Sequence, residues 1–137
     1  MIKKKPSAPR KIVKKSIKKI NDSERVRDLV IEGMQEKKGK EIVCIDLRNL
    51  KNAVADFFII CHADSRTHID AIARSIEEVV YKKQKEDPLH KEGTQNSEWI
   101  LLDYFNVVAH IFLHEKREFY GIERLWADAE IQQIASN

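Results

Sequence analysis

The sequence predicts a single α/β domain in which helices flank a small mixed sheet. Short runs rich in Val, Ile and Phe alternate with longer segments whose apolar residues recur every three or four positions. The first pattern favours strands and the second favours amphipathic helices, in the order αββαββα. The chain has 137 residues, 42% of them apolar and 34% charged, which suits one domain with one hydrophobic core.

The first helix and the first two strands are predicted from residues 21–63. The helix is expected to begin at Asn21, which forms a capping box with Glu24, and to end at Gly39. Two apolar runs, 41–48 and 55–63, then predict strands. The second run is apolar along nearly its whole length, which is typical of a central strand covered on both faces.

Residues 64–83 have the clearest helical pattern in the chain. Asp64 or Ser65 can cap the helix, and Lys82 and Lys83 suit the negative end of its dipole. One face of this helix carries an apolar stripe, formed by Ile69, Ile72, Ala73, Ile76 and Val80. The polar residues 84–97 that follow predict a loop.

The most apolar stretch, residues 98–112, predicts a β-hairpin. Its strand-like runs are Trp99–Leu102 and Val107–Leu113, and four residues from Asp103 to Asn106 separate them. The segment after the hairpin predicts a short helical turn interrupted at Gly121. The apolar anchors expected in that segment are Phe119, Ile122, Leu125 and Trp126.

One face of the first hairpin strand is a candidate contact surface. Side chains alternate along a strand, so Trp99, Leu101 and Asp103 share a face. An aromatic residue and a leucine beside a carboxylate indicate an apolar face that is open to a partner, unless the segment around Trp126 covers it. The candidate partner-binding residues are Trp99, Leu101, Asp103, Tyr104 and Phe105.

The net charge of +3 conceals a basic arm attached to an acidic domain. Residues 1–20 contain nine of the 25 Lys and Arg residues and no acid, so the rest of the chain carries 16 bases and all 22 acids, a net charge of −6. Pro6 and Pro9 favour a flexible arm, followed by a domain over 21–130 and a tail over 131–137. The arm can attract RNA phosphates, or it is a solubilising tail or a transit peptide. Its candidate nucleic-acid contacts are Lys11, Lys14, Lys15, Lys18 and Lys19.

The sequence contains no motif for an enzymatic site. It has no Gly-rich phosphate loop, no G-x-S-x-G and no H-E-x-x-H. A strand followed by a helix capped at Ser65 is how minimal nucleotidyltransferases begin, but these enzymes need paired carboxylates to hold two metal ions. The D-x-E match, Asp128 to Glu130, lies in the C-terminal segment. We therefore expect neither catalysis nor a cofactor or metal, and Ser65 is interpreted as a helix cap.

Cysteines and histidines also favour a structural interpretation. Cys44 and Cys61 each lie in an apolar run, which predicts buried free thiols in a reducing cytosol. The histidines are scattered, and His110 on an apolar strand is interpreted as a core residue. No apolar run approaches the roughly 20 residues that span a bilayer, so a membrane segment is not expected.

Three segments of the sequence resemble the Iojap family of ribosomal silencing factors. They are ADFFIICHADSRTHIDAIARSIEE, EWILLDYFNVVAHIF and REFYGIERLWADA, and the match runs from about residue 22 to residue 129. The resemblance implies an αββαββα fold that is related to nucleotidyltransferases but lacks catalysis. It also implies binding to the large ribosomal subunit through ribosomal protein L-fourteen, which blocks joining of the small subunit and damps translation when nutrients are scarce. Organellar relatives are implied to serve ribosome assembly.

The resemblance assigns the contact with ribosomal protein L-fourteen to Trp99, Leu101 and Asp103, with Asp103 meeting a basic residue of that protein. It suggests a bacterial cytoplasmic factor more than one of an organellar matrix. Two alternatives from other classes are a nucleotidyltransferase-like enzyme and a module that self-associates, for example as a homodimer when free.

The chain departs from the family pattern at two turns. Residues 62–65, His-Ala-Asp-Ser, stand where many relatives have a T-G-T-S-like turn. Phe105 and Asn106 stand where relatives often place glycine in the hairpin turn. Asn106 can adopt a positive φ, whereas Phe105 cannot do so without strain, so the turn is expected to differ in shape and to add Phe105 to the contact surface.

Overall fold

The computed structural model describes the backbone of residues 10–135 and the side chains of residues 22–135. One six-stranded sheet has the order β3-β4-β5-β2-β1-β6. The strands are β1 Lys40–Asp46, β2 Phe57–Ala63, β3 His90–Glu92, β4 Trp99–Asp103, β5 Val107–Leu113 and β6 Glu130–Gln133. The helices are α1 Arg10–Glu36, α2 Arg66–Gln84, α3 His114–Tyr120 and α4 Ile122–Leu125.

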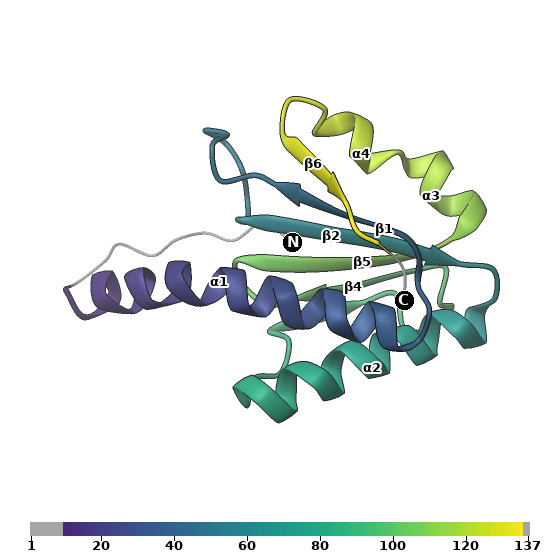
Figure 1. Ribbon diagram of the computed structural model, residues 1–137, viewed down its shortest axis with the longest axis horizontal. Coiled ribbons are helices and arrows are strands. Elements are labelled where there is room, and N and C mark those ends of the chain that lie inside the picture. Colours follow the sequence, from purple (N-terminus) through teal and green to yellow (C-terminus); the bar gives the residue numbers. More distant parts are fainter. Residues whose placement is uncertain (1–9, 136–137) are drawn as a thin grey trace.

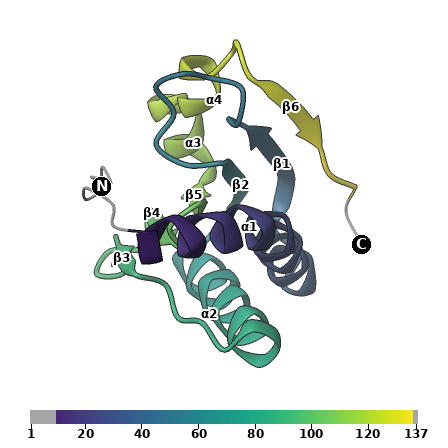
Figure 2. The same cartoon turned by 90° about the vertical axis from the view of Figure 1, so that its left-hand side faces the viewer.

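The sheet separates two helical layers of unequal size. The long helices α1 and α2 lie on one face, and the short helices α3 and α4 lie on the other (Figures 1 and 2). Each face carries its own hydrophobic cluster, because alternate residues of every buried strand point to opposite faces. The predicted mixed α/β domain with flanking helices is confirmed.

The parallel pair β2 and β5 forms the centre of the sheet. Phe57 of β2 lies opposite Val107 of β5, and the register continues to Ala63 opposite Leu113. All seven residues of each strand are buried. The prediction of a central strand covered on both faces is therefore confirmed for β2, and every other pairing in the sheet is antiparallel.

Helices α1 and α2 approach each other closely at Gly33. A Cβ atom on this glycine would lie 2.6 Å from the Cα atom of Ile76, so no larger side chain fits without moving a helix. The hydroxyl of Ser75 donates to the Gly33 carbonyl at 2.8 Å across the same contact. At the start of α2, the hydroxyl of Ser65 accepts from the backbone N–H of His68 at 3.1 Å, which confirms the predicted cap.

The chain differs from the sequence prediction at the first helix. Helix α1 begins at Arg10, whereas the capping box predicted a start at Asn21, so Asn21 lies inside the helix. The backbone of the second half of the expected arm, from Arg10 on, therefore continues α1. Residues 1–9 lie outside the described residues, as do the side chains of residues 10–21.

Two edge strands were not predicted. Strand β3 lies in the expected loop over 84–97, and β6 lies at the junction of the expected domain and tail. All residues of both strands are exposed, and each strand pairs on one side, β3 with β4 and β6 with β1. They bury no apolar face and therefore leave no periodic signal in the sequence.

The conformation of the turn between β4 and β5 differs from the one predicted for Phe105. Phe105 itself adopts the positive φ, +82°, whereas Asn106 does not. The carboxylate of Asp103 accepts a hydrogen bond from the Phe105 N–H at 2.9 Å, which compensates for a backbone conformation that is unfavourable for a bulky side chain.

The thiols of Cys44 and Cys61 are free and buried, as predicted. Burial raises the pKa of Cys44 to about 11 and that of Cys61 to about 12. Both thiols are therefore protonated and poor nucleophiles near neutral pH. Within residues 10–135, no helix has the combination of length and apolar character that a membrane crossing requires.

Gly33→Ala should destabilise the domain although alanine is the better helix former. The added methyl group gains about 1 kcal/mol of helix propensity but overlaps backbone atoms of α2, and such overpacking costs about 1–3 kcal/mol. Urea unfolding followed by circular dichroism should therefore show a net loss of stability. The exposed Glu36→Ala on the same helix is the control and should change stability by less than about 0.5 kcal/mol. A stabilised Gly33→Ala variant would contradict the close approach of the two helices.

Candidate protein-contact face

Trp99 lies at the centre of an aromatic cluster on the sheet face that carries α3 and α4. Its indole ring stacks on Phe112 of β5, with ring centroids 4.8 Å apart, and contacts Tyr120 of α3 at 4.6 Å. Its N–H donates to Nδ1 of His110 at 3.1 Å. Three neighbours from two elements thus fix the position of a side chain that remains partly exposed.

The exposed aromatic residues of α3 extend this surface. Phe119 is 73% exposed and Tyr120 is 45% exposed, and their rings meet edge to face at 5.1 Å. We call the surface formed by Trp99, Phe119 and Tyr120 the aromatic face. Exposed aromatic rings in mutual contact are typical of sites that bind another protein.

The prediction that Phe119 and Leu125 are buried anchors is wrong. Leu125 of α4 is 75% exposed, even more than Phe119. Ile122 is buried as predicted, and Trp126 is half-buried with its ring 6.0 Å from that of Phe58. The expected cover of the sheet face by Trp126 is therefore confined to the region of Phe58, because α3 and α4 are too short to bury all their apolar residues.

The candidate partner-binding residues of the hairpin are buried to very different extents. Trp99 and Phe105 are half-buried, whereas Leu101, Asp103 and Tyr104 are 8%, 1% and 4% exposed. Tyr104 packs in the cluster beneath α1 and α2, on the opposite side of the sheet from Trp99. The hairpin therefore offers a partner mainly Trp99, at the start of β4, and Phe105, in the turn after β4, whose shape Asp103 helps to fix.

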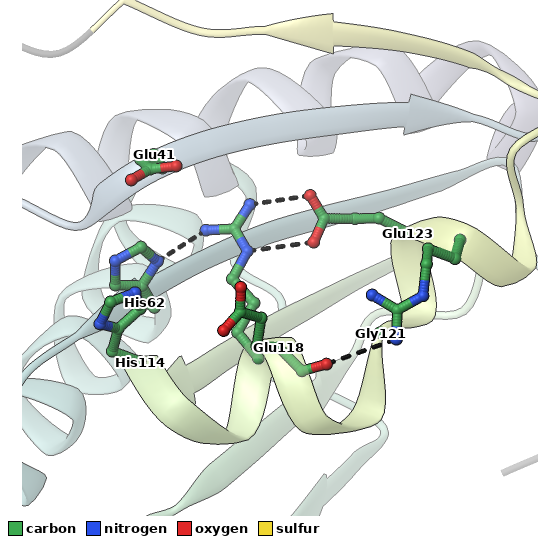
Figure 3. Close-up of a pocket in the computed structure, with 8 residues that line it drawn as sticks. Glu41, His62, His114, Glu118, Gly121 and Glu123 are labelled. Atoms are coloured by element: carbon green, nitrogen blue, oxygen red, sulfur yellow. Dashed lines mark hydrogen bonds and ion pairs between the residues drawn. The ribbon is translucent and has the colours of Figure 1, made fainter.

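Arg117 anchors α3 to the sheet beside the aromatic face. Its guanidinium makes two 3.1 Å contacts with the carboxylate of Glu123 in α4, and Nη1 donates to Nδ1 of His62 at 2.8 Å (Figure 3). The same Nη1 lies 3.4 Å from the Lys40 carbonyl of β1. Arg117 thus ties α3 to α4, β1 and β2 and holds Tyr120, three residues along, in place.

The pocket around Arg117 has a volume of about 190 Å³. Burial lowers the pKa of His62, and the adjacent Arg117 and His114 lower it further; the rings of the two histidines stack at 4.6 Å. His62 must be neutral to accept the hydrogen bond from Arg117, because a protonated ring has no nitrogen that can accept. No group of three or more His, Cys, Asp or Glu residues in the described part of the chain could hold a metal ion. The pocket is therefore interpreted as a structural clamp.

The remaining candidate residues lie away from this face or outside the described residues. Ser65, which a nucleotidyltransferase would use near phosphate, is the cap of α2. The side chains of the arm lysines, Lys11, Lys14, Lys15, Lys18 and Lys19, lie outside the described residues. Tyr120 was not predicted to be a surface residue of the site. The sequence does contain a signal for an exposed ring here. Adjacent residues on a helix point about 100° apart, so Phe119 and Tyr120 cannot both face the sheet.

Comparison with known proteins identifies relatives along nearly the whole chain. The model of the family described as "Ribosomal silencing factor during starvation" matches residues 20–137. A ribosomal silencing factor RsfS from Halalkalibacterium halodurans is 31% identical over 112 residues, which cover 82% of this chain and 94% of the relative.

Solved structures share the fold. A crystal structure of a protein from Chromobacterium violaceum superposes with a TM-score of 0.71 at 31% identity and covers 76% of this chain and 85% of that one. A crystal structure of a protein from Bacillus halodurans gives a TM-score of 0.67 at 27% identity and covers 82% of this chain and 98% of the other.

The buried His110 should make the stability of the domain depend on pH. Burial lowers its pKa from 6.5 to about 3, so below pH 6.5 the unfolded chain binds a proton that the folded chain does not. Stability is therefore greatest above about pH 6.5 and falls as the pH drops towards 3. Between pH 7.5 and pH 5 this group alone should lower the free energy of unfolding by about 2 kcal/mol.

Urea unfolding at the two pH values tests this expectation. His110→Leu should remove about 2 kcal/mol of the difference between pH 7.5 and pH 5, whereas the exposed control His90→Leu should retain the wild-type difference. Equal pH dependence in His110→Leu and the wild type would mean that His110 is not buried in the neutral form.

Proposed function

Because the chain belongs to the family of ribosomal silencing factors, we propose that it binds the large ribosomal subunit through ribosomal protein L-fourteen and sterically blocks association with the small subunit. The family is named for regulation and not for catalysis, so the chain is a factor that regulates translation rather than an enzyme. Its place of action is the compartment that contains ribosomes, which we propose to be the bacterial cytoplasm.

The observation that carries the proposal is the aromatic face. Partly exposed aromatic residues at the centre of an interface contribute a large share of binding energy, because a partner excludes water from a large, rigid apolar surface. Trp99 is the best-supported anchor, since Phe112, Tyr120 and His110 hold its ring in one position. Phe105, in the turn after β4, lies beyond the opposite end of this strand from Trp99, and we propose it as a separate, second contact.

The buried residues of the hairpin support this contact from within. Asp103 is 1% exposed, and its carboxylate caps the turn that carries Phe105. We therefore propose that Asp103 acts on the partner through the shape of the turn. Leu101, 8% exposed, packs in the cluster beneath the aromatic face.

The charge of the domain favours a basic protein as the partner. The chain outside residues 1–20 carries a net charge of −6, which opposes binding to RNA phosphates and favours a basic ribosomal protein. The arm has the opposite charge. We propose that it contacts nearby ribosomal RNA and adds a salt-sensitive attraction to the protein contact.

Trp99→Ala should weaken binding to purified large subunits by at least about 2 kcal/mol, or roughly 30-fold, as expected for a central aromatic residue. The matched control is Tyr81→Ala, which removes a 49% exposed aromatic ring from α2, on the other side of the sheet. The control should bind as the wild type does. A folded Trp99→Ala protein with wild-type affinity would show that the aromatic face is not the contact surface.

Replacing the five arm lysines at positions 11, 14, 15, 18 and 19 with glutamine should flatten the salt dependence of subunit binding. Each phosphate that the arm no longer neutralises should reduce the slope of log affinity against log salt by up to about 0.9. The exposed pair Lys51→Gln and Lys82→Gln removes charge from the folded domain and is the control. Unchanged slopes in the arm variant would leave the arm as a solubilising segment, and loss of all binding at low salt would place the main site in the arm.

A further inference from the structure

The hydrogen bond between Trp99 and His110 fixes the tautomer of the histidine. The indole N–H of Trp99 can only donate, so Nδ1 of His110, 3.1 Å away, accepts and carries no proton. The neutral ring must then carry its proton on Nε2. Since burial lowers the pKa of His110 to about 3, this neutral form is the one present near neutral pH.

The Nε2–H group of His110 has no hydrogen-bond partner among the described residues and is shielded from solvent. The ring lies between aromatic neighbours, 4.7 Å from Phe58 and 6.2 Å from Phe112. A buried donor without an acceptor costs free energy, and an apolar side chain at this position would avoid that cost. A buried side chain that costs stability in this way is expected where it serves function rather than stability.

The bond to Trp99 is the one hydrogen bond that the structure gives to the His110 ring in the described part of the chain. Stacking on Phe112 and the tilted contact with Tyr120 restrain the plane of the indole ring, but such ring contacts tolerate sliding and rotation within that plane. A hydrogen bond is directional and selects one orientation. His110 therefore supplies the directional restraint that the aromatic neighbours lack.

We propose that His110 is a positioning residue of the partner contact. By accepting the indole N–H, His110 turns the only polar atom of the Trp99 ring inward, so the exposed part of the ring is entirely apolar. This inference rests on the proposed function of the aromatic face. It specifies the group that the partner places on Trp99, which is an aliphatic surface, either a hydrocarbon side chain or the methylene stem of a lysine or arginine. A hydrogen-bond acceptor aimed at the indole N–H would find it already engaged.

The test uses two substitutions of His110 in two backgrounds. His110→Leu removes the acceptor, whereas His110→Asn places an amide oxygen near the former position of Nδ1. With Trp99 present, His110→Leu should weaken binding to purified large subunits about fivefold to tenfold, and His110→Asn should restore most of the affinity. In a Trp99→Phe background, which has no N–H to hold, His110→Leu should cause no further loss of affinity.

Nitrogen-15 NMR of the free protein supplies a second readout. The imidazole shifts of the wild type should report a proton on Nε2, and the Trp99 indole signal, assigned with Trp126→Phe, should move in His110→Leu and stay in place in His110→Asn. A wild-type proton on Nδ1, or equal weakening by His110→Leu in both backgrounds, would overturn the inference. Equal weakening in both backgrounds is the result that a general loss of stability in His110→Leu would cause.

The same series separates the contact role of the aromatic face from the positioning role of His110. If Trp99→Ala binds as the wild type does, the aromatic face is not the contact and the proposed function of this face fails, while the NMR result still decides whether His110 orients the indole. If Trp99→Ala weakens binding and His110→Leu does not, the face is the contact and the positioning role of His110 is wrong.

Discussion

The parallel pairing of β2 and β5 at the centre of the sheet determines how the other elements are arranged. Parallel neighbours cannot be joined by a tight turn, so the chain must cross one face of the sheet before it can return. Helix α2 makes this crossing, and β3 and β4 lead the chain back to β5. Both central strands are buried along their whole length, so both faces of the sheet need cover.

The two faces receive unequal cover, and this inequality produces the aromatic face. Helices α1 and α2 have 27 and 19 residues, whereas α3 and α4 have seven and four. The short pair cannot enclose every apolar side chain on its side, so Phe119 and Tyr120 stay at the surface and Trp99 remains partly exposed. Arg117 offsets the small contact area of α3 with bonds to β1, β2 and α4. The face is thus held rigid without being buried.

Much of the fold could be predicted from the sequence because burial imposes a period on it. Helix α2, strand β2 and the β4–β5 hairpin all follow apolar patterns, and Ser65 caps α2 as predicted. Every residue of strands β3 and β6 is exposed, so no periodic apolar pattern marks them. The positive φ of Phe105 depends on the carboxylate of Asp103, a contact that residue propensities do not describe.

The candidate site was predicted less completely. Alternation along β4 correctly placed Trp99, Leu101 and Asp103 on one face, but it could not tell how deeply each one lies. Tyr120 and His110 belong to the surroundings of Trp99 through contacts across the sheet, and such contacts appear only once the register and the path of α3 are known.

The proposed function requires that the chain occupy the surface of the large subunit that the small subunit needs. This requirement can be tested by sedimentation of the protein with purified ribosomal particles, with free large subunits, free small subunits and cross-linked joined ribosomes run in parallel. The protein should sediment with free large subunits and be absent from the other two fractions. Equal binding to free large subunits and to joined ribosomes would contradict it, because a factor that tolerates the small subunit cannot block its association.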